Sequence, residues 1–160
     1  MKKIVFSFVF AMALLFTANG QYKNAVSIDP FSYSIINLEY ERFVFSQDNH
    51  HFSLKGLAGY GIAMDGWMTG VEAVYGFGNN HRVEVGFGGT FLYSNRSDAV
   101  YNFFIGGFRL NYAYYSKGNP LVYRVGWMPL MNHELTENAP SEFKTNYDWN
   151  TITIGIGYRF

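Results

Sequence analysis

The last twelve residues, from Trp149 to Phe160, read W-N-T-I-T-I-G-I-G-Y-R-F and decide the fold. From residue 151 on, one parity holds threonine, glycine and arginine, and the other holds Ile152, Ile154, Ile156, Tyr158 and Phe160. Such alternation is typical of a β-strand with one apolar face, because successive side chains point to opposite sides. An exposed apolar strand in a soluble protein promotes aggregation, whereas a closed barrel in lipid has no free edge and turns its apolar face outward. The pattern therefore predicts a membrane β-barrel.

The composition favours the same class of protein. Aromatic residues make up 20% of the 160-residue chain, and charged residues make up 15%, against about 25% in ordinary soluble domains. Aromatic girdles at both interfaces are a feature of membrane barrels. Twelve basic and twelve acidic residues, without a basic cluster, give no electrostatic reason to expect nucleic acid as a partner. The absence of cysteine excludes disulfides, thiol catalysis and cysteine-based metal sites.

Residues 1–20 have the features of a cleaved signal peptide. Lys2 and Lys3 precede an apolar run over 4–16, and small residues follow at the expected cleavage site. The alternative is an N-terminal membrane anchor, but the run falls short of the roughly 20 residues that a spanning helix needs. We therefore expect a signal peptide over 1–20 and a barrel domain over 21–160.

Alternating patterns predict seven clear strands, at 31–45, 51–60, 68–77, 82–93, 100–115, 121–128 and 149–160. Bacterial single-chain barrels have an even number of strands, so a short eighth strand is expected at 25–28, followed by a turn at Asp29-Pro30. The connections alternate between short and long, and the longest covers 129–148. If the short ones are periplasmic, both termini are periplasmic too. The prediction is an all-β, eight-stranded antiparallel up-and-down transmembrane barrel in a bacterial outer membrane.

The parity also assigns the charged side chains. If Ile, Phe and Tyr face lipid, the inward parity collects Glu39, Glu41, Lys55, Glu72, Arg82, Glu84, Arg109, Arg124 and Arg159. A basic side chain on the lipid face at mid-depth costs about 2–4 kcal/mol. Arg42 is an exception, near a strand end from which it can reach the headgroups. An eight-stranded interior is filled by side chains, so we expect these acids and bases to pair. The alternative is a charged lining for an ion pathway.

The ending I-x-I-x-I-x-Y-x-F resembles the terminal-strand signal that the barrel-assembly machinery reads, which would consist here of Ile154, Ile156, Tyr158 and Phe160. The segment N-L-E-Y-E-R at 37–42 resembles an N-x-x-Y-E-R pattern in small barrel proteins of Bacteroidota-like bacteria. With eight strands, the mature chain is similar to small OmpA/OmpX-type barrels. The resemblance implies a location and a fold, with outer-membrane lipid and the assembly machinery as partners. It implies no activity, because these families include adhesins, structural proteins and lipid-modifying enzymes.

Three tryptophans are predicted at the outer ends of strands, where they would form a headgroup-level belt: Trp67, Trp127 and Trp149. The long loop at 129–148 is the best candidate for binding an unknown partner, because long loops on rigid scaffolds often carry function. The same loop could equally only shield the mouth of the barrel.

Catalytic and metal sites find thin support in the sequence. His50, His51 and His81 fall in the short turns assigned to the periplasm, and consecutive histidines cannot share one strand face to bind a metal. His133, Glu134 and Ser141 lie in a loop, whereas a general base needs a rigid frame. We therefore expect no catalytic residue, no metal and no cofactor.

The most consistent role is structural, or a surface interaction through the outer loops. The alternatives are a narrow or gated pore for small solutes and a lipid-modifying outer-membrane enzyme. A soluble barrel of lipocalin type would need its apolar face inward.

Overall fold

The computed structural model describes residues 22–30, 36–61, 66–95, 100–134, 145–148 and 152–160. Within these ranges every strand pairing is antiparallel. None of these residues belongs to a helix long and apolar enough to cross a membrane. The predicted signal peptide and Trp149 lie outside the described residues.

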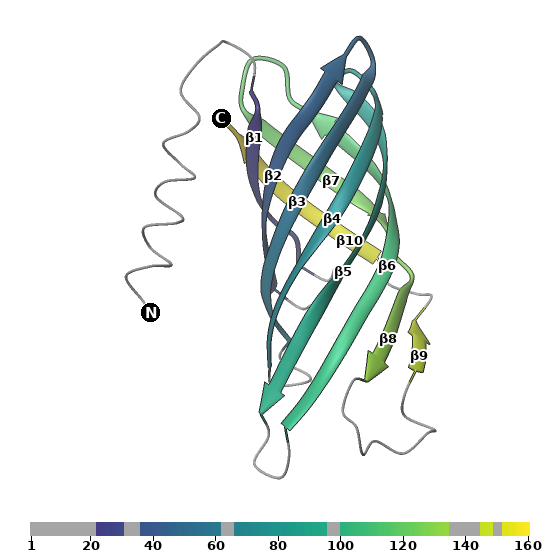
Figure 1. Cartoon of the computed structure of the whole chain (residues 1–160). Coiled ribbons are helices and arrows are strands. Elements are labelled where there is room, and N and C mark those ends of the chain that lie inside the picture. Colours follow the sequence, from purple (N-terminus) through teal and green to yellow (C-terminus); the bar gives the residue numbers. More distant parts are fainter. Residues whose placement is uncertain (1–21, 31–35, 62–65, 96–99, 135–144, 149–151) are drawn as a thin grey trace.

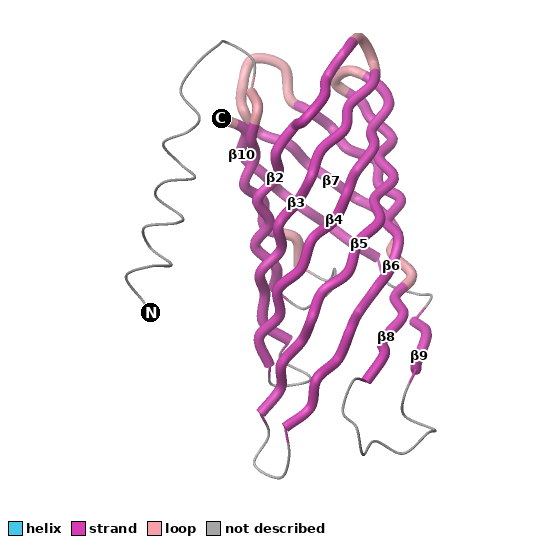
Figure 2. The backbone as a smooth tube through the Cα atoms, viewed as in Figure 1, coloured by secondary structure: helices cyan, strands magenta, loops and turns pink. Residues whose placement is uncertain are grey.

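Ten strands build one closed barrel (Figures 1 and 2). Their bounds are β1 Asn24–Ile28, β2 Ile36–Gln47, β3 His50–Gly61, β4 Gly66–Gly78, β5 His81–Asn95, β6 Val100–Tyr115, β7 Leu121–Trp127, β8 Leu130–Glu134, β9 Thr145–Asp148 and β10 Ile152–Arg159. Strands β1 to β6 pair in sequence order, β6 pairs with β7, β7 with β10, and β10 with β1. Strands β7 and β8 both pair with β6 and together make one barrel strand, and β9 with β10 makes another. The barrel therefore has the eight strands predicted.

The weak first strand is formed. Ala25 pairs with Arg159 of β10 on one side and with Glu41 of β2 on the other, so β1 closes the barrel. Asn24 and Phe160 exchange backbone hydrogen bonds of 3.1 and 2.9 Å. The Arg159 amide also donates to the Pro120 carbonyl in the β6–β7 turn, at 2.8 Å. The chain thus enters β1 and leaves β10 at the end of the barrel that carries the short turns (Figure 1); we call this end the turn rim.

The prediction of a continuous loop over 129–148 is wrong, because this segment contains β8 and β9. Pro129 has no backbone N–H, so the ladder is interrupted after Trp127. Pairing then resumes on the same strand: β7 pairs with β6 up to Leu110–Trp127, and β8 pairs with it from Gly107–Leu130, in the same register. The proline therefore breaks the hydrogen bonding without changing the alignment of the strands.

The two faces of the wall differ as the alternation predicts. In β10, Ile152, Ile154 and Ile156 are 49–62% exposed, whereas the intervening Thr153 is 1% exposed. Large apolar side chains point outward on the other strands of the barrel as well, among them Leu38, Leu54, Val71, Phe87, Tyr112 and Val125. The outside is thus a continuous apolar surface.

The interior is layered along the barrel. An apolar cluster fills the end opposite the turn rim and consists of Leu57, Met68, Leu92, Ile105 and Met128. Charged side chains occupy the middle, and Tyr115 packs with Ala113, Val122 and Phe43 nearer the turn rim. This apolar cluster lies on one side of the charged layer and was not predicted from the alternation.

Candidate functional site

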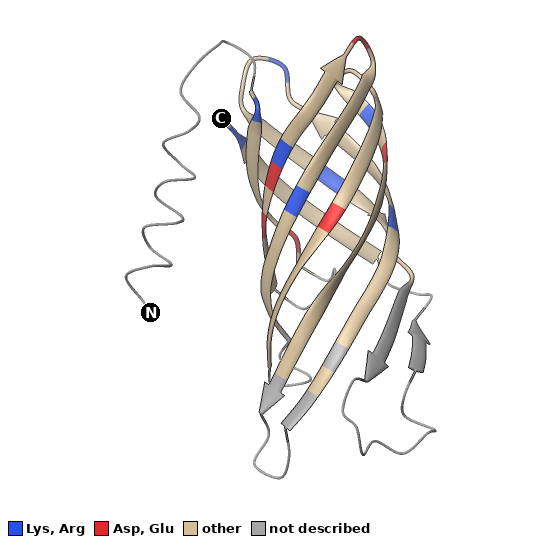
Figure 3. Ribbon diagram, viewed as in Figure 1, with Lys and Arg blue, Asp and Glu red and all other residues tan. Residues whose placement is uncertain are grey.

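The candidate site is the charged layer inside the barrel, in the half nearer the turn rim (Figure 3). Seven of the nine predicted residues are at most 5% exposed: Glu39, Glu41, Lys55, Glu72, Glu84, Arg109 and Arg124. Arg82 and Arg159 are half-buried and lie closer to the turn rim. The structure therefore gathers seven charges in one buried layer, which we call the charge network and whose ion pairs form two clusters, and leaves two charges at its edge.

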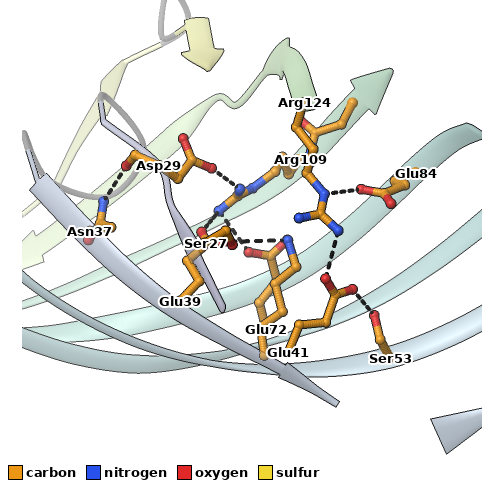
Figure 4. Close-up of polar contacts among 12 residues, drawn as sticks. Ser27, Asp29, Asn37, Glu39, Glu41, Ser53, Glu72, Glu84, Arg109 and Arg124 are labelled. Atoms are coloured by element: carbon orange, nitrogen blue, oxygen red, sulfur yellow. Dashed lines mark hydrogen bonds and ion pairs between the residues drawn. The ribbon is translucent and has the colours of Figure 1, made fainter. Parts of the chain in front are cut away.

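Arg109 of β6 is the first centre of this network. Its guanidinium contacts Glu39 Oε1 of β2 at 2.9 Å and Glu72 Oε2 of β4 at 3.0 Å, and it also contacts Asp29 Oδ2 (Figure 4). Strands β2 and β6 lie four places apart in a ring of eight, so they are on opposite walls. The Arg109–Glu39 ion pair thus spans the lumen.

Arg124 of β7 is the second centre. It contacts Glu41 Oε2 at 2.6 Å and Glu84 Oε2 at 2.8 Å (Figure 4). The Tyr115 hydroxyl accepts from Arg124 Nη2 at 2.8 Å and donates to the other oxygen of Glu84 at 2.7 Å. Ser53 Oγ donates to the other oxygen of Glu41 at 2.5 Å. Each carboxylate around Arg124 is thus also bonded to a hydroxyl, as buried polar groups require.

Lys55 adds a third buried cation. Its Nζ lies 3.3 Å from Glu39 Oε2, and Ser27 Oγ donates to the same oxygen at 3.4 Å. Glu39 therefore receives both Lys55 and Arg109. Glu72 differs: it approaches Arg109, but neither of its oxygens has a hydrogen bond to a described residue.

Asp29 belongs to the network, although the sequence analysis placed it in a turn. It is 1% exposed, pairs with Arg109, and its backbone amide donates to the Asn37 carbonyl at 3.0 Å. The missed signal was the parity of β1: Ala25 and Ser27 point inward, and Asp29 continues that series. With Asp29, the fully buried layer holds five carboxylates and three cations.

Glycines leave room for these side chains at two close approaches. A Cβ at Gly86 would meet the Glu72 carboxylate, whose Cδ would be 2.9 Å away. A Cβ at Gly126 would likewise meet the side-chain oxygen of Asn111. The interior is therefore packed around the polar groups, and the inward glycines do not open a channel at these two positions.

The remaining predicted residues lie on the wall. Ile154, Ile156, Tyr158 and Phe160 are all exposed on the outer face. Trp67 is 72% exposed at the start of β4, with its ring 5.1 Å from that of Tyr60. Trp127 ends β7, but it pairs with Leu110 in the interior of β6, so its position is part-way along the wall.

Arg42, the exception on the lipid parity, is half-buried, and its Nη1 donates to Asn24 Oδ1 at 3.0 Å. It thus lies at the turn rim, near the barrel end that the sequence analysis assigned to it.

The three histidines that were predicted in short turns belong instead to the first residues of β3 and β5, and each has a hydrogen-bond partner. His50 pairs with the Tyr75 hydroxyl and His81 with the Tyr112 hydroxyl, both at 2.5 Å. His51 contacts the Gly78 carbonyl at 2.8 Å. Among the described residues, no group of three or more His, Cys, Asp or Glu side chains could hold a metal ion. His133 and Glu134 belong to β8, and Ser141 lies outside the described residues.

No protein-family model matches the sequence, and no curated protein matches it. Among solved structures, the chain is similar to the N-terminal β-barrel domain of Pseudomonas aeruginosa OprF. The TM-score is 0.51 and the identity 16%, over 89% of this chain and 100% of that one. The fold is that of a small eight-stranded barrel. The likeness extends over nearly the whole chain.

Proposed function

We propose that the protein is an integral outer-membrane barrel with a closed, charge-paired interior, acting in a structural role or in surface contacts through its loops. The observation that carries the proposal is the pair of arginine centres inside an apolar outer surface: Arg109 joins the opposite strands β6 and β2, and Arg124 joins β7 to β2 and β5.

The apolar wall supports the location. Side chains such as Val71, Phe87 and Ile152 are more than 60% exposed, and a continuous surface of this kind in water would promote association. In lipid the same surface is buried, and closure of the barrel pairs the strand edges. The predicted export signal and the short turns favour an outer membrane with the turn rim toward the periplasm. Outer-membrane lipid and the assembly machinery that reads the terminal strand are the partners we infer.

The packing of the lumen supports a closed barrel. Ion pairs cross the charged layer, and the Leu57–Met68–Leu92–Ile105–Met128 cluster fills the next layer. Removing charges from water is costly unless they are paired and hydrogen-bonded, so a dry interior requires this arrangement. We accordingly infer no enzymatic role. A surface partner would meet the end of the barrel opposite the turn rim, where β3, β5 and β8 end.

Extraction tests the location. A barrel of this kind should stay in the membrane fraction through salt and carbonate washes and should leave it only with detergent. Release of the folded protein by carbonate alone would mean that the apolar wall is not in lipid.

Planar-bilayer recording tests the closed interior. The purified protein should give no reproducible single-channel steps, and Lys117→Gln, on the exposed β6–β7 turn, should behave the same way. Steps in the unsubstituted protein that change in size with Arg109→Gln, and not with Lys117→Gln, would establish the pore alternative.

A further inference from the structure

A polar cavity of about 250 Å³ opens at the turn rim, outside the paired network. Residues lining it include Arg82, Arg159, Asn79, Asp48, His51 and Tyr115. It therefore brings the two cations that the network leaves at its edge into one pocket.

Both arginines are held in place by groups that leave their charge unneutralised. The Arg82 guanidinium carbon lies 3.7 Å from the centre of the Tyr115 ring, and that of Arg159 lies 5.2 Å from it. Arg82 Nε donates to the Asn79 carbonyl at 2.8 Å, and Arg159 Nη2 donates to the Ser116 and Asn119 carbonyls at 3.0 Å. Backbone carbonyls and an aromatic face position a guanidinium without cancelling its charge.

Each guanidinium keeps N–H groups without an acceptor. Within the described residues, Nη1 and Nη2 of Arg82 make no hydrogen bond, and Nη1 of Arg159 makes none either. No ion pair joins either arginine to a carboxylate in the same part of the chain. Among the described residues that line the cavity, Asp48 is the one acid, and it is exposed at the tip of the β2–β3 turn.

His51 takes no part in the free donor set. Its Nε2 lies 2.8 Å from the Gly78 carbonyl, which can only accept, so Nε2 carries a proton. Its Nδ1 lies 2.7 Å from Ser46 Oγ. Both nitrogens are thus engaged within the wall, and the unused donors of the cavity come from the two arginines.

We propose that this cavity binds a small water-soluble oxyanion of the phosphate or carboxylate class. A guanidinium presents parallel N–H donors that match two oxygens of such an anion, and charge-assisted bonds of this kind are stronger than neutral ones. Both arginines line this one cavity, so the proposed anion contacts both guanidinium groups. The site lies at the rim of the barrel on its inner side, so the anion enters from water.

Isothermal titration of the folded protein in a zwitterionic detergent tests the site, with inorganic phosphate and succinate as probes at constant chloride. We expect saturable binding of at least one probe, weakened tenfold or more by Arg82→Gln. Arg82→Lys, which keeps the charge but loses the parallel N–H donors of the guanidinium, should give an intermediate affinity. Lys117→Gln, on the neighbouring turn and outside the cavity lining, should leave the affinity unchanged. Arg82 makes one backbone hydrogen bond, so its replacement should spare the fold, which far-ultraviolet circular dichroism checks.

The proposal is overturned if neither probe binds saturably, or if Lys117→Gln weakens binding as much as Arg82→Gln, which would indicate general surface attraction. A repeat in bilayer discs separates a soluble anion from a lipid headgroup. Equal affinity in zwitterionic and phosphatidylglycerol-containing discs supports the soluble ligand. A loss of affinity in the anionic discs would show that the net-anionic phosphatidylglycerol headgroup competes for the site and would overturn the assignment to a soluble anion.

Discussion

Replacing Arg109 by glutamine tests whether the charge network holds the barrel together. Arg109 is 1% exposed and contacts three carboxylates, on Asp29, Glu39 and Glu72. Removing one partner of a buried ion pair costs about 3–5 kcal/mol, because the other charge is left buried and unpaired. Lys55 still contacts Glu39 in the variant, so we expect a loss of about 4 kcal/mol and not the sum of three broken pairs.

The free energy of unfolding can be measured by urea titration of the protein folded into phospholipid vesicles, with tryptophan fluorescence as the signal. Lys117→Gln, on the exposed β6–β7 turn, is the control and should change stability by less than about 0.5 kcal/mol. A loss below about 1 kcal/mol for Arg109→Gln would refute the reasoning. It would mean that the carboxylates reach water, as they do at a surface, and that the interior is not sealed.

A second substitution identifies the carboxylate that loses its partner when Arg109 is replaced. Glu72 has no hydrogen bond to a described residue and contacts Arg109, so adding Glu72→Gln to Arg109→Gln removes a stranded charge. We expect the double variant to recover about 1–2 kcal/mol, within the range found for contacting pairs. Adding Glu84→Gln instead should not restore stability, because Glu84 pairs with Arg124. Equal recovery with either glutamate would assign the effect to net charge and not to the specific contact.

Three further predictions concern the wall, the packing and assembly. Val71→Arg, in the middle of β4, should cost about 2–4 kcal/mol in vesicles, whereas Val83→Arg, near the turn rim, should cost about 0–1 kcal/mol, because the penalty depends on depth. Gly86→Ala should cost about 1–3 kcal/mol by crowding a buried carboxylate, measured by the same titration. Phe160→Ala should slow insertion into vesicles that contain the assembly machinery, if the terminal strand carries the insertion signal.

Each of these has its own control. Equal costs for the two arginine substitutions on the wall would contradict the assigned depth of β4 and β5. Gly56→Ala is the control for Gly86→Ala, because a Cβ at Gly56 meets no atom within 4 Å. An equal loss of stability in Gly56→Ala would point to backbone effects. For Phe160, unassisted folding into pure lipid should be much less affected; an equal delay in both systems would mean that the residue acts on folding itself.

Much of the fold could be predicted because one physical rule applies to every strand. Alternation fixes which side chains share a face, and the cost of charge in lipid decides which face is outside. The short strand at 25–28 was predicted because the strand number must be even, and its weak alternation only located it. Its pairings with β2 and β10 confirm that inference.

The errors came where local signals conflicted with long-range pairing. Asp29 was interpreted as a turn residue because Pro30 follows it, yet the inward parity of β1 extends to its side chain. Pro129 was interpreted as the start of a loop, yet the part of β6 that β7 does not pair with is paired with β8 from Leu130 on. Contacts across the lumen, such as Arg109 with Glu39, depend on the tilt and stagger of the whole barrel, which no local pattern contains.

The charge balance connects the closed interior with the cavity at the turn rim. The fully buried layer holds two more carboxylates than cations, and Arg82 and Arg159 lie at its edge without carboxylate partners of their own in the described chain. The five buried carboxylates, the three buried cations and the two rim arginines have a formal net charge of zero. The rim arginines thus offset the excess negative charge of the buried layer from a distance. Attraction between charges weakens with distance, so the N–H donors of these arginines stay free. An acid paired directly with either arginine would neutralise the rim and disturb this balance. The charge that offsets the acid-rich buried layer is thus carried by two arginines in a pocket that is open to water.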